Sequence, residues 1–449
     1  MNYHILLKIG VKEMKNKELL NKVWQLSIPA ILTQITTIAM QYIDSAMVGN
    51  LGANASAAIG LVSTSTWVFW GITYAASVGF SVQVAHQIGA KNQKEARNVV
   101  KHGLIVSALV SFLLLVVGLF IAKPLPGWLG ADTVIHQDAT YYFIVFAFVL
   151  PFSQLSSLCA SFLQCSGDMV IPSILNAVTC VLDVVFNAIF IPLYGVLGAG
   201  IGTGLATIVV SIVMFWFCCF HNKDLKFKKN ESFVYDKRII TEAFKIGLPV
   251  CGEQVATSLA SVISTMIIAP LGTIAIAAHS FAVTAESLCY MPGYGVESAA
   301  TTLVGQSYGA KDYVLSKKFA NISTALGATL MGITGLIMFI ICPFVFSILT
   351  PDVAVQTLGT QVLRIQLIVE PLFGVSMVAS GALRGVGDTL VPGLINLFSV
   401  WVIRLGLSFL LVGSFGLHGV WVAMSVDLCF RGLVLLYRQQ KSPHFNQKS

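Results

Sequence analysis

The stretch SIPAILTQ at residues 27–34 decides the fold, because it returns as GLPVCGEQ at 247–254 and opens a second copy of the chain. The two prolines, Pro29 and Pro249, set a constant offset of 220 in residue number (249 − 29). The same offset pairs further positions: Leu51-Gly52 with Leu271-Gly272, Gly89-Ala90-Lys91 with Gly309-Ala310-Lys311, Gly167-Asp168 with Gly387-Asp388, and Asn176 with Asn396. Unrelated apolar segments would not keep one register all the way from Pro29 to Asn176. In a membrane chain, such a duplication predicts a transporter with two lobes, since substrate sites form where repeats meet.

The composition is that of a chain largely surrounded by lipid. Hydrophobic residues make up 56% of the 449 residues and charged residues 10%, against roughly 25% charged in soluble domains. A membrane-spanning helix needs about 20 mainly apolar residues. About twelve segments qualify, beginning near Trp24, Ala57, Val99, Thr140, Met169, Val196, Thr241, Ala275, Lys318, Val355, Thr389 and Leu417. The expected fold is an all-α membrane protein of about twelve transmembrane helices in two pseudo-symmetric six-helix lobes.

One charged segment, HNKDLKFKKNESFVYDKR at 221–238, separates the two lobes. The expected parts are an N-terminal segment at 1–22, a six-helix lobe at 23–220, the basic linker at 221–238, a second six-helix lobe at 239–438 and a tail at 439–449. Because six is an even number, both lobes start on the same side of the membrane. This implies a parallel repeat about an axis along the membrane normal.

The net charge of +7 indicates topology rather than nucleic-acid binding. Basic residues gather before the first segment, after the second and eighth, and in the linker: Lys8, Lys12, Lys15, Lys17, Lys22, Lys91, Lys94, Arg97, Lys101, Lys311, Lys317, Lys318, Lys223, Lys226, Lys228, Lys229 and Lys237. In a twelve-helix count these positions fall on one side, which the positive-inside rule places in the cytoplasm. We expect a multi-pass protein of the cytoplasmic membrane with both termini in the cytoplasm. The chain has no Walker-type loop and no metal-type cysteine spacing, so we expect neither nucleotide nor cofactor.

Seven stretches resemble the multidrug and toxic compound extrusion (MATE) family: IDSAMVGNLGANASAAIG, SVQVAHQIGAKN, FIPLYGVLGAGIGT, GLPVCGEQ, LGTIAIAAHS, ATTLVGQSYGAKD and GALRGVGDT. The resemblance spans roughly Lys22 to Arg438. It implies a twelve-helix efflux antiporter that exchanges inward-moving sodium ions or protons for outward-moving amphipathic organic cations. We expect it to act as a monomer in membrane lipid.

Charged side chains inside the apolar segments require a reason, because one carboxylate at the bilayer centre costs about 2.5–3.5 kcal/mol. Seven acids and two arginines lie there: Asp44, Asp183, Glu253, Glu286, Glu297, Glu370, Asp427, Arg364 and Arg404. They must face the bundle interior, water or each other. The offset of 220 places Asp44 opposite Ser264 and Asn187 opposite Leu407, so the charges are specific to each lobe. This pattern favours function over a structural requirement of the fold.

The N-terminal lobe has one candidate ion site. Asp44 lies on the first helix, Asp183 and Asn187 share a face of the fifth because they are four residues apart, and Thr203 lies early on the sixth. Carboxylate, amide and hydroxyl oxygens bind a hard cation such as sodium, whereas crowded, desolvated carboxylates carry protons. Asp44 and Thr203 match family positions. The family order on the fifth helix is Asn then Asp, and it is reversed here.

The C-terminal lobe offers four candidates for binding an ion or the substrate: Glu253, Glu286, Glu297 and Glu370. Sodium-coupled relatives place acids on the seventh and tenth helices, where Glu253 and Glu370 lie about one turn from the usual positions. Glu286 and Glu297 either line a cavity or pair with Arg364 or Arg404. Asp427 and Arg431, four residues apart, are expected to form a structural ion pair.

These observations predict a cation-coupled multidrug exporter whose lobes rock about a central cavity, with ion binding changing the shape of the first helix. One alternative is a flippase for lipid-linked oligosaccharides or peptidoglycan precursors, which needs a strongly cationic cavity. The acids outnumber the intramembrane arginines here, seven to two. A polytopic membrane enzyme is the second alternative, but no catalytic spacing supports it.

Overall fold

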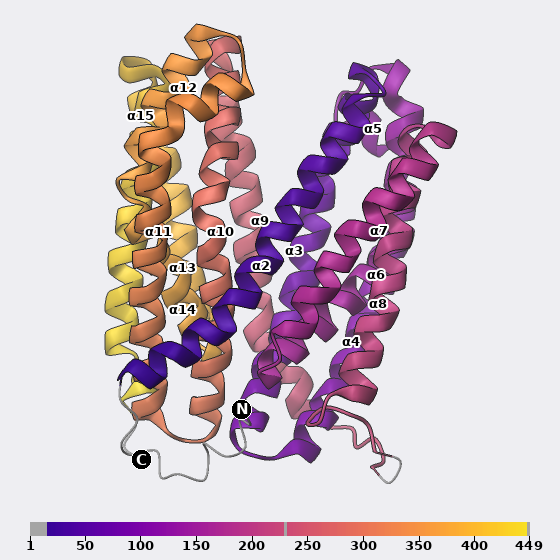
Figure 1. The fold of residues 1–449 in the computed structure, drawn as a ribbon, viewed down its shortest axis with the longest axis vertical. Helices are drawn as coiled ribbons and strands as arrows, with labels where there is room; N and C mark the ends of the chain where they lie inside the picture. The colour runs from indigo at the N-terminus through magenta and orange to yellow at the C-terminus, as the bar shows by residue number, and fades with distance from the viewer. Residues whose placement is uncertain (1–15, 229–230, 447–449) are drawn as a thin grey trace.

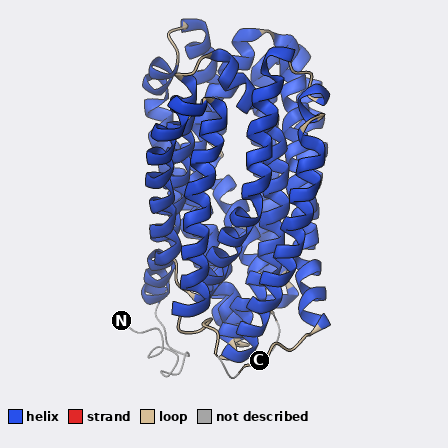
Figure 2. Cartoon of the chain, turned by 90° about the vertical axis from the view of Figure 1, so that its right-hand side faces the viewer, coloured by secondary structure: helices blue, strands red, loops and turns tan. Residues whose placement is uncertain are grey.

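The computed structural model describes residues 16–228 and 231–446. The first fifteen residues of the expected N-terminal segment, including Lys8, Lys12 and Lys15, lie outside this range. So do two residues of the linker and the last three of the tail. Figure 2 shows that the secondary structure of the described residues is helical throughout.

The N-terminal lobe contains six long helices and a short one. Their bounds are α2 (Asn16–Gly49), α3 (Ala53–Gly89), α4 (Gln93–Ala122), α5 (Leu125–Trp128), α6 (Thr133–Ser166), α7 (Val170–Tyr194) and α8 (Val196–Trp216), with a π-helical turn η2 (Phe217–His221) ending the lobe. Several of these helices begin with a side-chain cap. At the start of α4, for example, Oδ1 of Asn92 accepts a hydrogen bond from the backbone N–H of Glu95.

The C-terminal lobe repeats this plan with two interrupted spans. It contains α9 (Lys237–Ile268), η3 (Ala269–Leu271), α10 (Thr273–Gly309), α11 (Tyr313–Leu349), α12 (Val353–Leu367), α13 (Glu370–Gly385), α14 (Leu390–Phe398), the π-helical η4 (Ser399–Arg404), α15 (Leu405–Lys441) and η5 (Pro443–Phe445). In the described residues ten helical segments can each cross a membrane, and α12 with α13, bent by 55°, makes an eleventh. Gly416, with φ 56° and ψ −136°, breaks the last segment into two spans. The expected all-α fold of about twelve spans in two lobes is confirmed.

The π-helices change the register of the repeat. Gly195, with φ 59° and ψ −129°, ends α7 just as Gly416 breaks α15, and the offset between these two glycines is 221 (416 − 195). The extra residue enters at η4, because a π-helical turn accommodates one more residue than an α-helical turn. The repeat partner of Asn187 is therefore Ser408 rather than the expected Leu407. Neither residue has a side-chain amide, so the asparagine is still specific to the N-terminal lobe.

The first helix of each lobe crosses to the other lobe. Leu19 and Val23, near the start of α2, pack with Val296 of α10, whereas the later part of α2 lies against α7. Correspondingly, Ile246 of α9 packs against Val78 of α3. In Figure 1, α2 runs from the lower end of the C-terminal lobe to the upper end of the N-terminal lobe. The lobes adjoin at the lower end of the figure and diverge towards the upper end.

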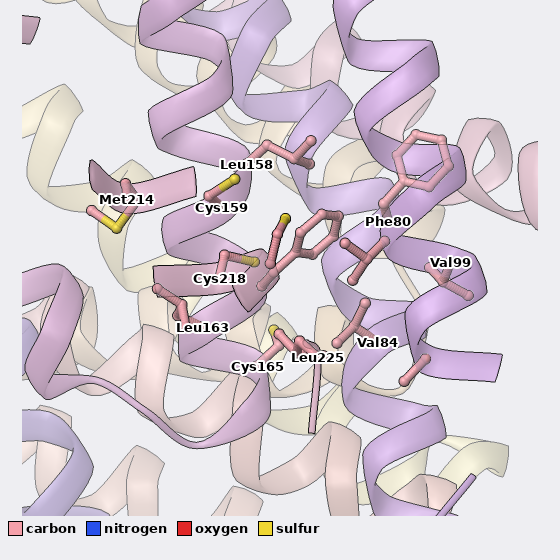
Figure 3. Packing of buried hydrophobic residues seen from close by; sticks show 14 of the residues in the cluster. Phe80, Val84, Val99, Leu158, Cys159, Leu163, Cys165, Met214, Cys218 and Leu225 are labelled. Atoms are coloured by element: carbon pink, nitrogen blue, oxygen red, sulfur yellow. The ribbon is translucent and has the colours of Figure 1, made fainter. Parts of the chain in front are cut away.

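The lower end in Figure 1 is called the basic end here, because α3 and α10 finish there and are followed by Lys91 and Lys311. Both lysines adopt φ near +60°. The π-helical turn η2 adds one residue to the N-terminal lobe and restores the offset of 220, which pairs Leu225 of the linker with Phe445 of the tail (445 − 225). Each of the two is buried in the base of the preceding lobe. Figure 3 shows Leu225 packed with Cys159, Cys165 and Cys218, which are free cysteines among apolar side chains. The repeat therefore extends beyond the membrane helices.

Candidate functional site

The first, fifth and sixth helices of the N-terminal lobe bring the predicted ion-site residues together. Asn187 on α7 donates from Nδ2 to Oδ1 of Asp44 on α2, at 3.0 Å. Asp183 lies one turn earlier on α7, is 0% exposed and has its carboxyl group next to that of Asp44. The sequence spacing had placed Asp183 and Asn187 on one face, and the structure turns that face towards Asp44.

Two neighbouring ionised carboxylates cannot hydrogen-bond to each other, because each only accepts. Within the described part of the chain, neither oxygen of Asp183 has a hydrogen-bond donor, and Oδ1 of Asn187 also has none. Leaving such groups unsatisfied in a buried place is costly. A proton shared by the carboxyl groups, or a small cation held between the oxygens, would satisfy them. The arrangement therefore fits a group that binds and releases a cation.

The sixth helix closes the site through backbone contact rather than through the predicted hydroxyl. A Cβ on Gly202 of α8 would overlap Oδ1 of Asn187, so only glycine allows the helices to come this close. Thr203 follows it and is half-buried. Among the described residues its hydroxyl makes no bond to Asp44, Asp183 or Asn187. Sequence reasoning missed Tyr142 of α6, which lies near both carboxyl groups.

The C-terminal lobe has a matching bridge between the same two helices of its repeat. Asn396 on α14 donates from Nδ2 to Oε1 of Glu253 on α9, at 2.7 Å. Asp44 and Asn187 are 143 residues apart, and so are Glu253 and Asn396. The C-terminal bridge lies eleven positions earlier in the repeat (44 − 33, since Glu253 is opposite Thr33), or about three helical turns.

Glu286 and Glu370 form a second acidic group, at the break between α12 and α13. Gln366 near the end of α12 donates to Oε1 of Glu286 on α10, at 2.7 Å. Glu370, the first residue of α13, is 0% exposed and lies close enough to Glu286 for their charges to interact. In the described structure neither of its carboxyl oxygens has a hydrogen-bond partner. Like Asp183, it can remain buried if it carries a proton or contacts a cation.

One of the two alternatives for Glu286 and Glu297, a pairing with Arg364 or Arg404, does not occur among the described residues. Glu297 instead pairs with Arg384, at 2.7 Å between Oε1 and Nη1, and the same Nη1 donates to the hydroxyl of Tyr74 at 3.0 Å. Arg384 was missed because it lies near the end of its apolar segment. The count of seven acids to two arginines therefore left out buried arginines that lie close to the acids.

Asp427 is held by two arginines, of which only one was expected. Arg431 binds its Oδ2 at 2.9 Å, and this confirms the predicted ion pair. Arg404 binds the same oxygen at 2.7 Å, and the Ser399 hydroxyl donates to Oδ1. Both carboxyl oxygens of Asp427 are therefore bonded, in contrast to those of Asp183 and Glu370.

Three aromatic residues of α3 contact one another in series, and the last of them, Tyr74, accepts a hydrogen bond from Arg384. Trp67 contacts Trp70 edge to face at 5.8 Å between ring centroids, and Trp70 stacks on Tyr74 at 5.7 Å. Both tryptophans are about half exposed. Phe69 points elsewhere and packs on Phe143 in the lobe core. Trp67 and Trp70 are therefore accessible from outside the helix bundle, whereas Phe69 belongs to helix packing.

Comparison with known proteins identifies the family. The MatE family model matches the chain twice, at residues 29–189 and 249–410, in agreement with the duplication seen in the sequence. The chain belongs to the MATE family. This family is one of transporters rather than enzymes.

Curated MATE relatives are similar over nearly the whole length of the chain. The probable multidrug resistance protein NorM of Thermotoga maritima is 26% identical over 441 residues, covering 93% of this chain and 92% of the relative. The protein of the same name from Listeria monocytogenes is 26% identical over 442 residues, covering 94% of each.

Solved MATE structures share the fold. A mutant of the Vibrio cholerae MATE transporter VcmN superposes with a TM-score of 0.91 at 19% identity, covering 96% of this chain and 99% of that one. A MOP-superfamily transporter from Pyrococcus furiosus gives 0.90 at 21% identity, with 97% and 100% covered. The structural description of the latter says that the reverse polarity of its pocket suggests a different function.

Proposed function

We propose that this MATE protein is a secondary antiporter that exports amphipathic organic cations from the cytoplasm in exchange for inward-moving protons or sodium ions. The observation that carries the proposal is the pair formed by Asp44 and Asp183. Among the described residues neither buried oxygen of Asp183 has a donor, and the two neighbouring carboxyl groups fit a proton or a cation. The curated relatives are described as probable multidrug resistance proteins, which supports the substrate class.

In this arrangement the exported ligand would lie between the lobes and leave at the end at which they diverge. Trp67 and Trp70 present flat aromatic surfaces, which attract organic cations. At the inner end of these surfaces Glu253 and Glu297 lie near Arg384, and Glu253 also interacts with Arg431. The acids that have no partner among the described residues, Asp183 and Glu370, favour cations over the pyrophosphate groups that a lipid-precursor flippase handles. Glu286 and Glu370 are proposed to take up a second proton or cation in the C-terminal lobe.

The basic end is proposed to lie in the cytoplasm, in accordance with the positive-inside rule. The structure then has its lobes closed towards the cytoplasm and apart towards the outside. Alternating access would reverse this arrangement by rocking the lobes. The crossing helices α2 and α9 would connect ion binding in one lobe to movement against the other, since each contacts both lobes.

A transport assay in everted vesicles tests the proposal, with a proton or a sodium gradient imposed separately and efflux of a cationic dye followed by fluorescence. The active gradient identifies the coupling ion. Asp44→Asn keeps the shape and one hydrogen-bond acceptor but removes the charge, so it should abolish gradient-driven transport while dye binding in detergent persists. Wild-type transport by Asp44→Asn would exclude the N-terminal site. Transport of a pyrophosphate lipid without dye transport would favour the flippase.

A further inference from the structure

The lobes are joined at the basic end by two hydrogen bonds that the repeat relates to each other. Nε2 of His86 on α3 lies 2.8 Å from the carbonyl oxygen of Gly385 at the end of α13. Nε2 of Gln306 on α10 donates to the carbonyl of Cys165 at the end of α6, also at 2.8 Å. The repeat offset of 220 relates the two side chains (306 − 86) and also the two carbonyls (385 − 165). Because a carbonyl only accepts, His86 must donate from Nε2.

The two carbonyls are free for this purpose because the helix ends leave them without a local partner. After α13, the backbone N–H groups of Val386, Gly387 and Asp388 turn back onto the carbonyls of Leu383 and Arg384. After α6, Gly167 and Asp168 bind the carbonyls of Gln164 and Leu163 in the same way. The next carbonyl in each helix is one of the terminal groups that a helix cannot satisfy itself. The opposite lobe supplies the donor in both cases.

The backbones of α3 and α10 touch beside these bonds. A Cβ on Gly89 would overlap the backbone of Gln306, and a Cβ on Gly309 would overlap the backbone of His86. These glycines are repeat partners as well, with the same offset of 220 (309 − 89). Each glycine therefore packs against the backbone of the residue in the other lobe that donates the hydrogen bond.

A second layer lies closer to the space between the lobes. Arg384 donates to Tyr74 of the N-terminal lobe at 3.0 Å, and its repeat partner Gln164 (384 − 220) accepts from Ser298 of the C-terminal lobe at 3.2 Å. The residues before Gly385 and Cys165 thus also reach across. Thr302 of α10 also donates to the carbonyl of Gln164, at 3.2 Å. These bonds close this end together with the two backbone contacts, and the His86 and Gln306 bonds and the two glycine contacts follow the local two-fold pseudo-symmetry.

We propose that His86 and Gln306 form a paired latch that holds the lobes together at the basic end and opens when the transporter turns to that side. The assignment of that side to the cytoplasm rests on the proposed function; the latch itself does not. Water can replace the donors at helix-terminal carbonyls once the lobes separate, so the latch is reversible. Its two halves break together because they lie on the same pair of rigid helix ends.

The two halves differ in one respect. The His86 ring lies 5.2 Å from the ring of Tyr308, and the Tyr308 hydroxyl lies 3.3 Å from Nδ1 of His444 in the C-terminal tail. The repeat partner of Tyr308 is Ile88, which offers no such contact (308 − 88 = 220). The tail therefore supports the His86 half alone.

Distance measurement between spin labels tests the latch without any transport. Ala90 and Ala310 are exposed, follow α3 and α10 directly and are repeat partners, so labels at Ala90→Cys and Ala310→Cys report separation at this end. In a background with the native cysteines replaced, His86→Ala or Gln306→Ala should raise the ratio of separated to closed populations about fivefold, the shift expected for losing one hydrogen bond of about 1 kcal/mol. The double variant should raise it more than either single change.

The repeat provides a rescue variant, because the Gln306 half shows that a glutamine can fill this role. His86→Gln should therefore keep the closed population, although it removes the imidazole. Gln439→Ala is the matched control: Gln439 is a buried glutamine whose bonds to Thr324 and Asn321 stay within the C-terminal lobe. It should leave the label distances unchanged. An unchanged distribution in the double variant, or an equal shift for Gln439→Ala, would overturn the latch.

The same experiment separates failure of the latch from failure of the proposed function. Asp44→Asn, with no gradient present, should leave the response to His86→Ala intact, because Asp44 lies on the far part of α2. If the wild-type protein exports no cation but the distances respond as stated, the latch stands and the proposed function fails. If transport is normal in the His86→Ala, Gln306→Ala double variant and the distances do not change, the latch is wrong.

Discussion

Each lobe joins its first and fifth helices by a hydrogen bond between a carboxylate and an asparagine, but the two bonds lie at different distances from the basic end. In each, a carboxylate on the first helix accepts a hydrogen bond from an asparagine on the fifth, and the partners are 143 residues apart. The Asp44 bridge lies about three turns, or roughly 16 Å along the helix, farther from the basic end than the Glu253 bridge. The repeated backbone therefore fixes which helices meet, and single substitutions decide where the polar group sits.

This difference gives the lobes separate tasks. The Asp44 bridge lies next to Asp183, whose oxygens lack donors among the described residues, so this bridge can respond to a cation. The Glu253 bridge lies near Arg384 and Glu297, beside the latch that joins the lobes. We interpret the first as the ion-responsive bridge and the second as part of the floor between the lobes.

The largest expected effect concerns a charge cluster that only the C-terminal lobe possesses. Asp427 is 0% exposed and binds both Arg404 and Arg431, whereas the corresponding residue of the other lobe is Ala206 (427 − 221). Asp427→Ala leaves two buried arginines without their shared carboxylate, which should lower the free energy of unfolding by about 3–5 kcal/mol. Thermal unfolding in detergent measures the change. Glu242→Ala, which removes the exposed pair with Lys245, should cost less than about 1 kcal/mol.

A loss below about 1 kcal/mol for Asp427→Ala would mean that the arginines find other partners or water. A further variant, with Asp427, Arg404 and Arg431 all replaced by apolar residues, should recover much of the stability, since replacing a complete buried ion cluster is often neutral or favourable. Recovery would show that the cluster is dispensable for the fold, as the N-terminal lobe already suggests.

The second prediction compares the functional carboxylates of the two lobes. Asp183→Asn should lower gradient-driven efflux about tenfold, which corresponds to about 1.4 kcal/mol of coupling, because Asp44 can still bind the ion. Glu253→Gln should lower it less, since Asn396 already satisfies one oxygen and its neighbour Arg384 is paired with Glu297. Initial rates at matched expression provide the test. Equal losses would mean that both lobes couple to the ion.

Much of this organisation could be predicted from sequence, because the signals involved are local or periodic. Helix number follows from apolar length, the lobes follow from the constant repeat offset, and the shared face of Asp183 and Asn187 follows from their spacing. The hydrogen bond from Asn187 to Asp44 could be anticipated, since the resemblance placed both residues in one site. These predictions needed no knowledge of how helices rotate against each other.

The contacts that were missed depend on helix rotation and tilt. The pairing of Glu297 with Arg384, 87 residues away, is set by how α13 faces α10 after the 55° break. From the sequence alone, several arginines were possible partners of Glu297, and nothing distinguished Arg384 from the others. Likewise the π-helix η4 shifts the repeat offset by one, and a fixed offset could not reveal this shift. The latch combines two such contacts between lobes and was not expected.

The smallest expected effect concerns the segments that follow each lobe. Arg97 binds both carboxyl oxygens of Glu231 in the linker, at 2.6 Å each, and its repeat partner Lys317 (317 − 97 = 220) binds Asn446 and the carbonyl of Gln440 in the tail. The hydrogen bond from Arg97 holds the pKa of Glu231 below its usual value of 4.5. A lowered folded-state pKa stabilises linker docking above pH 4.5, and this stabilisation is lost as the pH falls through the folded value. The acceptors that Lys317 contacts in the tail are neutral, so this contact should not respond.

Hydrogen exchange, corrected for intrinsic rates, measures both segments in one sample. In a His444→Gln background, which removes the titratable ring of the tail, protection should fall between pH 6.5 and pH 3.5 in linker residues 222–228 and 231–236 and stay constant in tail residues 442–446. Glu231→Gln should lower linker protection at pH 6.5 and remove its pH dependence, because the glutamine does not titrate. If the tail loses protection in parallel, acid loosens the whole basic end and the Arg97–Glu231 pair is not the cause. If only the linker responds, the repeat-related residues Arg97 and Lys317 hold their segments differently. Arg97 acts through an ion pair with Glu231, and Lys317 acts through hydrogen bonds to neutral acceptors.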